Sequence, residues 1–498
     1  MHLSKSKFTT GLQCHKRLWL SVHERDAPEL ETDPAQQAIF DRGSQVGELA
    51  RTYVPGGLLI DLPHYEVRER VAATERALQG GAKVIYEASF IADDVFVAVD
   101  ILHRRGQRWT LTEVKSTCKV KPEHIPDAAV QTHVVRRAGL DVARTEVMHL
   151  NRACRFPDLD DLFVRTDVTD RVEDEIVDVP REARRQLRVL RGPEPEVEPG
   201  DHCTAPYDCP FIDRCWPERP EHHVSTLYRI GGKQLARLLD DGIETIHDLP
   251  DDFELGPIPD RQRRAVQSDK IIVERGLKQA LAQLEHPIAY LDFETIALPI
   301  PIWDGCAPYD GVPVQFSCHV EDADGELVHH EWLAEGDDDP RPALAEALVR
   351  ALRGAKTVLA YNAGFEIGCI QGLRAAVPEL DKELGRAQRR VRDLLPIVRD
   401  HVYHPDFGGS FSLKSVAPAL VPEVSYEGLA IGDGGLATVE LERLLLRGSE
   451  MSKAERRELR RALLEYCRVD TLAMVRSVAR LRALPSRRGG WRTVGGRR

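Results

Sequence analysis

The sequence predicts a multidomain α/β protein in which two α/β domains are joined by a helical bridge. With 498 residues, the chain is long enough for two or three domains, each with its own core. Strand-like and helix-like stretches alternate in both its first and its last part. A Pro/Glu-rich connector at residues 192–200 cannot continue a helix. We expect domains over residues 1–222 and 286–484, a bridge over 223–285, and a disordered basic tail over 485–498.

Composition narrows the class of protein. A hydrophobic content of 42% and a charged content of 30% are ordinary for a soluble globular chain. No run of about 18 apolar residues is present, so we expect no membrane span. The N-terminus lacks the apolar core of a signal peptide, which predicts a cytoplasmic protein. The net charge of −12 does not by itself suggest a nucleic-acid binder, although local basic faces can still bind one.

The N-terminal part contains the pattern of a β-hairpin followed by a helix and a strand. Residues 95–103 are largely apolar, and residues 109–115 alternate between polar and apolar side chains. The sequence RRGQ between them can turn, so the two stretches predict a hairpin. Residues 126–138 then read as a helix and residues 146–150 as a further strand.

The bridge reads as short helices around glycine turns. Its sequence is similar to a helix-hairpin-helix, in which glycine amides contact a phosphate without regard to base sequence. The candidate turn glycines are Gly231, Gly232 and Gly242. An ordinary helical linker is the alternative. We expect a long polar helix over residues 261–284.

The C-terminal part begins with three strands. The first has the sequence IAYLDFE, at residues 288–294. The second and third lie at residues 314–320 and 327–332, on either side of a turn at Asp324-Gly325. A helix over residues 340–353, a strand over 357–362 and mostly helices to 484 follow. Three antiparallel strands followed by helix, strand and helices are the element order of an RNase H-like domain, a mixed sheet with flanking helices.

Three acidic motifs in this C-terminal part have the spacing of a metal site. Asp292 and Glu294 lie two apart on a strand, so their carboxylates share one face. Tyr466 and Asp470 lie four apart on a predicted helix, so they are also neighbours. Glu366 follows the strand predicted over residues 357–362. Carboxylates gathered in this way can hold two hard divalent cations, an arrangement suited to phosphodiester hydrolysis.

These motifs resemble those of the DEDD superfamily of 3′–5′ exonucleases, which includes the DnaQ-type proofreading domains. The matching residues, in chain order, are Asp292, Glu294, Asn362, Phe365, Glu366, Tyr466 and Asp470. The resemblance implies that Asp292, Glu294 and Asp470 ligate one Mg²⁺ or Mn²⁺. It implies that Asp292 bridges to a second ion that Glu366 helps to hold, and that Tyr466 orients the attacking water.

One residue departs from the DEDD pattern. Glu366 stands where the superfamily has Asp, and its extra methylene displaces the carboxylate by about 1.5 Å. Asp393 is the alternative fourth acid. Nearby, Gly408 and Gly409 predict a flexible turn, Ser410 or Ser412 can cap the next helix, and Lys414 either contacts a phosphate or is simply solvated.

The N-terminal hairpin carries a second acidic motif. Glu113 and Lys115 point to one face of their strand, and Asp100 approaches them across the ladder. The motif resembles the PD-(D/E)xK nuclease core, a restriction-endonuclease-like fold in which Asp100 and Glu113 would ligate Mg²⁺ and Lys115 would activate water. Gln131 on the following helix matches the RecB-like branch.

Two positions depart from the RecB-like pattern. Val135 stands where that branch usually has a tyrosine. Gly47 stands where it usually has a histidine, and we expect the neighbouring Glu48 to serve as the metal ligand instead. The nuclease fold is therefore better supported than the activity of its site.

Ten cysteines are present, and four of them form a pattern. Cys14 lies near the N-terminus, and Cys203, Cys209 and Cys215 lie beyond the predicted nuclease core. This arrangement resembles the iron–sulfur staple of AddB-type and CRISPR-adaptation RecB-like nucleases, which implies a structural [4Fe–4S] cluster. A four-thiolate zinc site is the alternative. Isolated positions predict unliganded thiols for Cys118, Cys154, Cys306, Cys318, Cys369 and Cys467.

Nearly the whole chain resembles an uncharacterised prokaryotic family that fuses a RecB-like, iron–sulfur nuclease domain to an RNase H-like exonuclease domain. The resemblance implies a DNA-processing nuclease with two metal-dependent centres, the C-terminal one a 3′–5′ exonuclease. Its expected substrate is nucleic acid, DNA with single-stranded ends. A nucleic-acid-binding scaffold with degenerate sites and an RNA-processing exonuclease are the alternatives.

Overall fold

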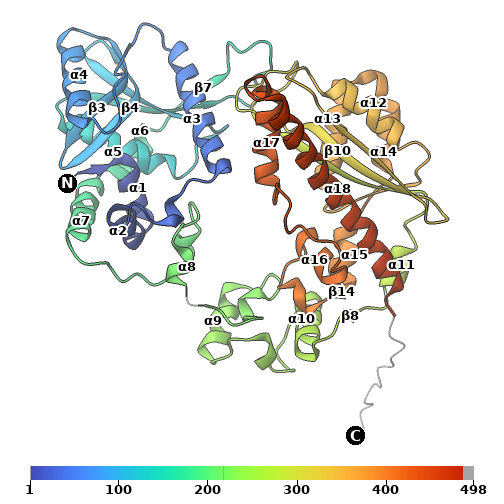
Figure 1. The fold of residues 1–498 in the computed structure, drawn as a ribbon. Helices are drawn as coiled ribbons and strands as arrows, with labels where there is room; N and C mark the ends of the chain where they lie inside the picture. The colour runs from blue at the N-terminus through green and yellow to red at the C-terminus, as the bar shows by residue number, and fades with distance from the viewer. Residues whose placement is uncertain (1, 217, 486–498) are drawn as a thin grey trace. The chain divides into compact units, whose positions relative to one another are not determined.

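The computed structural model describes residues 2–216 and 218–485 of a mixed α/β protein (Figure 1). The chain forms two compact units. The first contains residues 1–218 and 297–310, and the second contains residues 219–296 and 311–498. The predicted basic tail lies outside the described residues, apart from Pro485. Within the described ranges, every helix is too short or too polar to cross a lipid bilayer.

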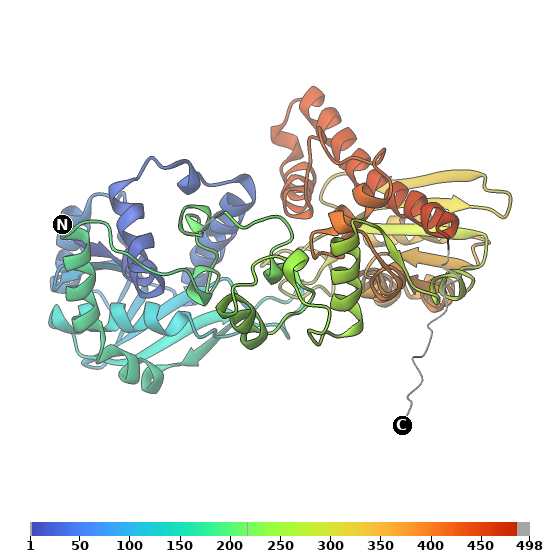
Figure 2. The same ribbon diagram turned by 90° about the horizontal axis from the view of Figure 1, so that it is seen from below.

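The first unit is built on a seven-stranded mixed sheet with the order β2-β3-β4-β5-β6-β7, in which β1 also pairs with β4. Its strands are β1 (Leu3–Ser4), β2 (Leu58–Leu59), β3 (Val84–Ala92), β4 (Val95–Arg105), β5 (Arg108–Lys115), β6 (Val142–Leu150) and β7 (Phe163–Asp167). Its helices are α1 (Lys5–Gln13), α2 (His15–His23), α3 (Pro34–Thr52), α4 (Val67–Gln79), α5 (His124–Arg137), α6 (Thr169–Ile176), α7 (Val179–Arg191) and α8 (Ile212–Cys215). Residues 2–216 run from blue to green in Figure 2.

The predicted hairpin, helix and strand of this unit are confirmed. The strands β4 and β5 pair antiparallel, α5 follows, and β6 returns parallel to β5. Alternate residues of β4, Val95, Val97 and Val99, join a core that also contains Val130 and Val134 of α5. The crossover through α5 therefore covers the sheet face that these valines present. The strand β3 was not predicted.

The second unit is built on a five-stranded sheet with the order β11-β10-β9-β12-β13. Its strands are β9 (Ile288–Ile296), β10 (Val312–Glu321), β11 (Leu327–Leu333), β12 (Thr357–Ala360) and β13 (Val391–Asp393), and a separate pair is formed by β8 (Ile272–Val273) and β14 (Val402–Tyr403). Its helices are α9 (Gly232–Asp240), α10 (Pro257–Ser268), α11 (Leu277–Leu281), α12 (Arg341–Ala351), α13 (Gly364–Ala376), α14 (Asp381–Arg389), α15 (Leu394–His401), α16 (Leu413–Leu420), α17 (Gly434–Leu446) and α18 (Lys453–Ala483).

Helices cover both faces of this sheet (Figure 1). The strand β9 alternates between the two faces because successive side chains of a strand point in opposite directions. Ala289, Leu291 and Phe293 pack in one core with α12, α13 and α14, whereas Tyr290 packs in another core with α18. Asp292 and Glu294 have the parity of Tyr290, so the strand presents both acids to the side of α18.

The segment predicted as a bridge packs within the second unit. Val224, Leu238 and Ile246 lie in the same core as Tyr290 and Val469. The helix α9 begins beside Gly231, and Gly242 has the left-handed φ of 74° that lets the chain turn after the helix. The element after that turn is a single 3₁₀ turn at Ile246–Asp248 rather than a second α-helix.

The predicted long helix over residues 261–284 is wrong. The helix α10 ends at Ser268, and Asp269 caps it in the left-handed conformation, with a φ of 48°. Ile272 and Val273 then pair with Tyr403 and Val402, and the separate helix α11 follows. Branched side chains favour a strand where another strand is available to pair.

Candidate functional site

Four carboxylates from three elements meet beside the sheet of the second unit. Asp292 and Glu294 come from β9, Glu366 from the first turn of α13, and Asp470 from the middle of α18. Burial raises the pKa of Asp292 most, and the negative charges of Asp470, Glu294 and Glu366 raise it further. The structure therefore brings together the acids of all three predicted motifs.

These acids hold protons unusually strongly. Burial raises the pKa of Glu294 to about 8, helped by Asp470 and opposed by Lys414. Burial raises the pKa of Asp470 to about 6, against a hydrogen bond from Tyr426 and the charge of Lys414. Burial and the nearby Asp393 raise the pKa of Glu366 to about 7. Like charges placed together in a desolvated site resist ionisation unless a cation joins them.

Glu366 is the most enclosed member of the group. Its side chain belongs to a residue that is only 3% exposed, and among the described residues its Oε2 has no hydrogen-bond partner. The turn before it is strained, because Asn362 has a φ of 64°. Asp393, the alternative fourth acid, accepts hydrogen bonds from the backbone N–H groups of Asn362 and Leu395. Asp393 thus ties the start of α13 to the start of α15.

Two side chains beside these acids had not been expected from the sequence. The thiol of Cys467, grouped above with the isolated cysteines, lies 3.4 Å from Oδ2 of Asp292. One ligand atom from each of Asp292, Glu294 and Cys467 lies within 4.8 Å of the others. The phenol of Tyr426 donates a hydrogen bond to Asp470. Spacing gave no signal for either residue, since Tyr426 comes from the connection between α16 and α17.

Lys414 brings a positive charge to the same place. Its Nζ lies 5.0 Å from the centre of the Tyr466 ring and 5.5 Å from that of Tyr426, and it donates a hydrogen bond to the carbonyl of Gly432. It also lines an open hollow of about 480 Å³ with Ser410 and other residues. Ser412 caps α16, as predicted. Lys414 is thus held between two phenol rings rather than simply solvated.

The acidic motif of the first unit forms a second centre. Glu113 is 1% exposed, and each of its oxygens has a donor: Lys115 lies 2.9 Å from Oε1, and Gln131 donates to Oε2 at 2.6 Å. Asp100 accepts a hydrogen bond of 2.6 Å from the backbone N–H of Val114. The four residues predicted for this centre, Asp100, Glu113, Lys115 and Gln131, therefore lie together.

The two acids of this centre differ in charge. Burial and the charge of Glu113 raise the pKa of Asp100 to about 8. Burial would also raise the pKa of Glu113, but the ammonium groups of Lys115 and Lys5 outweigh it and hold that pKa well below its usual range. Glu113 therefore ionises more readily than Asp100, which holds its proton more strongly than an ordinary aspartate.

Glu87, which the sequence analysis did not single out, is a third acid that acts on Asp100. Tyr86 pairs with Ile101 and Ala88 with Val99, so Glu87 stands opposite Asp100 in the sheet. It has a φ of 59°, which is costly for a residue with a side chain, and its charge contributes to the raised pKa of Asp100. Glu48 lies exposed on α3. Val135 is buried in the core, where the RecB-like branch has its tyrosine.

Two further charged residues complete the first unit's centre. Lys5, the first residue of α1, lies 2.6 Å from Oε1 of Glu113. Asp127, one turn before Gln131 on α5, forms an ion pair with Lys115. The spacing of four between Asp127 and Gln131 on a predicted helix is a signal that sequence reasoning could have used. Lys5 lies 108 residues before Glu113 in the sequence, so no local pattern indicates it.

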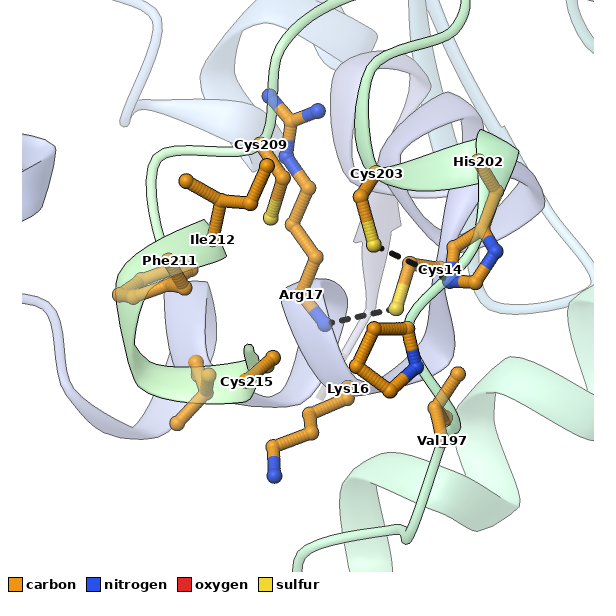
Figure 3. Close-up of a pocket in the computed structure, with 12 residues that line it drawn as sticks. Cys14, Lys16, Arg17, Val197, His202, Cys203, Cys209, Phe211, Ile212 and Cys215 are labelled. Atoms are coloured by element: carbon orange, nitrogen blue, oxygen red, sulfur yellow. Dashed lines mark hydrogen bonds between the residues drawn. The ribbon is translucent and has the colours of Figure 1, made fainter. Parts of the chain in front are cut away.

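The four predicted cysteines line one small cavity of the first unit (Figure 3). Cys14 lies at the junction of α1 and α2, Cys203 in a 3₁₀ turn, Cys209 in a loop and Cys215 at the end of α8. The pKa of Cys215 is raised by burial and by Cys14 and Cys203, against the charge of Lys16. Such an influence requires the thiols to be near one another. Four thiols from separate elements are a donor set that fits either an iron–sulfur cluster or zinc.

Comparison with protein families gives one match. Residues 289–412 match a family described as a domain of unknown function (DUF2779). The matched span includes Asp292, Glu294 and Glu366 and ends before α18, which carries Tyr466 and Asp470. A search of curated proteins found no match.

Proposed function

We propose that this protein is a metal-dependent nuclease that hydrolyses phosphodiester bonds, with a 3′–5′ exonuclease centre in its second unit and a RecB-like centre in its first. One observation carries the proposal: Asp292, Glu294, Glu366 and Asp470 gather from β9, α13 and α18 in one site, in which Glu366 and Asp470 are buried and the other two acids are partly exposed. Folding would not bring four acids together without a reason, because each repels the others. A bound cation supplies that reason.

The order of strands supports an RNase H-like fold for the second unit. The sheet β11-β10-β9-β12-β13 has two antiparallel strands on one side of β9 and two parallel strands on the other. The hairpin, crossover helix and parallel return of the first unit likewise support a PD-(D/E)xK core. These folds, together with the motifs, favour membership of the fused nuclease family that the sequence resembles.

The donor set of the second unit fits Mg²⁺ or Mn²⁺, which prefer carboxylate oxygens. Asp292, Glu294 and Asp470 would hold one ion, and Asp292 with Glu366 a second. Oε2 of Glu366 has no hydrogen-bond partner within residues 2–216 and 218–485, which supports this assignment, since a buried oxygen without a hydrogen bond needs another ligand. When bound, the ions lower the pKa of water and offset negative charge on the phosphate.

The chain's own residues then orient the reactants. The phenol of Tyr466 orients the attacking water, and Lys414, beside its ring, contacts the phosphate oxygens of the substrate strand. The hollow that Lys414 lines with Ser410 and Ser415 would hold part of that strand beside the lysine. In the first unit, Asp100 and Glu113 would hold a cation, while Lys115 stabilises charge on the phosphate and Gln131 fixes Glu113.

The four cysteines of the first unit support a structural metal group. Cys14 belongs to the N-terminal helices, whereas the other three follow α7, so a shared group would tie the two ends of the unit together. We assign a [4Fe–4S] cluster, with zinc as the alternative, and give it a structural role.

The test is degradation of single-stranded DNA by the full chain, purified without oxygen, with Mn²⁺ present. A 3′–5′ exonuclease produces a ladder from a 5′-labelled strand and releases a 3′ label as mononucleotide. We expect Asp292→Asn to abolish the ladder and Lys115→Ala to leave it intact. Asp252→Asn, which changes an exposed aspartate of the same unit, is the matched control and should behave as the parent.

Parent protein that binds Mn²⁺ and still leaves both labelled strands intact would contradict the nuclease proposal. RNA of the same base sequence, run in parallel, decides between a DNA enzyme and an RNA-processing exonuclease.

A nucleic-acid-binding scaffold is the second candidate, and the first unit holds the observation that favours it. Lys5, Lys115 and Gln131 already occupy both oxygens of Glu113. A carboxylate fully engaged by protein donors binds a metal less readily than a free one. Retained DNA binding by protein that takes up no Mn²⁺ in either unit would favour this candidate.

A further inference from the structure

Two lysines share one oxygen of Glu113. Nζ of Lys5 lies 2.6 Å from Oε1, and Nζ of Lys115 lies 2.9 Å from the same atom. Asp127 also pairs with Lys115, so that lysine divides its charge between two carboxylates. Lys5 forms an ion pair with Glu113 and with no second carboxylate among the described residues, although Asp127 and Asp100 also lie close enough to interact with its charge.

The position of Lys5 is determined by the helix that carries it. The hydroxyl of Ser4 caps α1 by accepting from the backbone N–H of Lys7. Phe8 is buried in the core of the unit, and the amide of Gln186 donates to its carbonyl at 3.0 Å. At the other end of α1, Gln13 donates to the backbone carbonyl of His202, beside the cysteines.

Close packing leaves α1 little freedom to move. A Cβ on Gly11 would lie 2.3 Å from the side chain of Gln186, so the helix and α7 are in contact without space for a methyl group. Because α1 is held in place, movement of its backbone cannot carry Lys5 away from Glu113. Its ammonium group must instead rotate away on its own stem.

We propose that Lys5 is a positioning residue of the first unit's centre, which competes with a divalent cation for Oε1 of Glu113 and so sets the metal affinity of that centre. The inference rests on the proposed nuclease function of the first unit. A second positive charge beside the ligand opposes the approach of a dication, and it holds the carboxylate in one orientation. The lysine thereby lowers the affinity of the centre for divalent cations.

The experiment measures Mn²⁺ binding rather than activity. The full chain carries Asp292→Asn and Glu294→Gln, so that the second unit's centre is impaired, and free Mn²⁺ is followed by electron paramagnetic resonance. Into this parent we introduce Lys5→Met, which keeps the apolar stem and removes the charge. We expect Mn²⁺ affinity to rise by about tenfold, since one unit charge at this distance exceeds the energy of a tenfold change.

Three further variants make the result specific. Lys5→Gln, which keeps a donor without charge, should also bind Mn²⁺ more tightly, and Lys5→Arg should bind it as the parent does. Lys7→Ala removes a lysine from the same helix that forms no ion pair among the described residues, and it should leave the affinity unchanged. A merely structural role for Lys5 predicts the opposite sign, because a loosened site binds metal less tightly.

The outcomes separate the inference from the function on which it rests. If the parent binds Mn²⁺ and Lys5→Met and Lys5→Gln bind it equally or less tightly, the inference is overturned and the nuclease proposal stands. If neither the parent nor these two variants bind Mn²⁺, the inference about Lys5 and the proposed nuclease function are both overturned for the first unit. Circular dichroism melts of each variant establish that it is folded.

Discussion

The phenol of Tyr426 donates a hydrogen bond of 2.7 Å to Oδ1 of Asp470. The contact joins the connection after α16 to the middle of α18, across 44 residues of sequence. Lys414 lies near the rings of both Tyr426 and Tyr466, so two phenols and one ammonium group surround the acid. The catalytic proposal therefore depends on a loop that the acidic motifs do not include.

Tyr426→Phe should reduce the Mn²⁺ affinity of the second unit, and with it the rate of exonuclease cleavage, by about 10–100-fold. The phenol orients the carboxylate of Asp470, and a ligand without its supporting hydrogen bond samples unproductive orientations. Calorimetric titration of Mn²⁺ and the rate of ladder formation measure the two effects. Tyr361→Phe is the matched control, since within the described residues its phenol hydrogen-bonds the carbonyl of Phe411 and none of the four acids. Equal losses in both variants would refute the role of Tyr426.

Stability without divalent cations should fall as pH rises from about 4 to 8. The folded pKa values of Glu294, Glu366 and Asp470, about 8, 7 and 6, lie above the unfolded values of 4.5, 4.5 and 3.8. In that window the folded state binds more protons than the unfolded state, so its stability is greatest below the unfolded pKa values and is lost as pH rises through the folded ones. A tenfold difference in proton affinity is worth about 1.4 kcal/mol.

Denaturant titrations in chelator between pH 5 and 9 measure this dependence. Added Mn²⁺ should restore stability most at the high end, where the acids are ionised. The variant Glu294→Gln should show a shallower dependence on pH than the parent. A pH profile that Glu294→Gln leaves unchanged would show that this group does not titrate as described.

Glu366→Gln should stabilise the protein in chelator and slow cleavage. The amide removes one of four mutually repelling charges from a buried site, and it also removes a ligand that the metal needs. Higher stability in chelator together with slower cleavage would indicate the loss of a metal ligand, because simple damage to the fold would lower both stability and cleavage. Glu379→Gln, an exposed change in the same unit, is the control and should alter neither thermal unfolding nor cleavage. A lower melting temperature with unchanged cleavage would contradict the assignment of Glu366.

Cys209→Ser should remove the metal group from the first unit and lower its stability. Protein purified without oxygen should contain iron and acid-labile sulfide in equal amounts and absorb visible light, and the variant should lose all three properties. Cys118→Ser changes a cysteine of the same unit outside the cysteine cavity and should keep them. Bound zinc without iron or sulfide would favour the zinc site over the [4Fe–4S] cluster. Protein that contains neither zinc nor iron and sulfide would exclude both kinds of site.

Two glycine substitutions should act in opposite directions. Gly11→Ala should destabilise the first unit by about 1–3 kcal/mol, because its methyl group would collide with the buried side chain of Gln186. Gly47→Ala should stabilise the same unit by about 0.5–1 kcal/mol, since Gly47 lies within α3 with open space around it. Urea unfolding of both variants tests the pair. If Gly47→Ala destabilises the unit, Gly47 must have a role beyond its place in α3.

The elements nearest to the motifs could be predicted because their patterns are local. Alternation along residues 109–115 identified β5, and apolar runs with turn residues identified β9, β10 and β11. The spacings of two and four placed Asp292 beside Glu294 and Tyr466 beside Asp470. The helix over residues 261–284 was misjudged because pairing with β14, more than a hundred residues away, decides the conformation of β8.

The residues that surround each motif could not be predicted, because they come from distant parts of the chain. Lys5 reaches Glu113 across 108 residues, and Tyr426 reaches Asp470 from a loop without a motif. Glu87 acts on Asp100 because strand register sets the two opposite each other. Sequence distance carries no information about such contacts.

The sequence by itself determined which chemical groups are present and which face of each element they share, because backbone geometry repeats with fixed periods of two and 3.6 residues. Only the tertiary structure decided which faces meet. Packing against the core placed the acids of β9, α13 and α18 in one desolvated site, with Cys467 and Lys414 beside them. Their charges and pKa values follow from that burial, which no single segment of the chain can create alone.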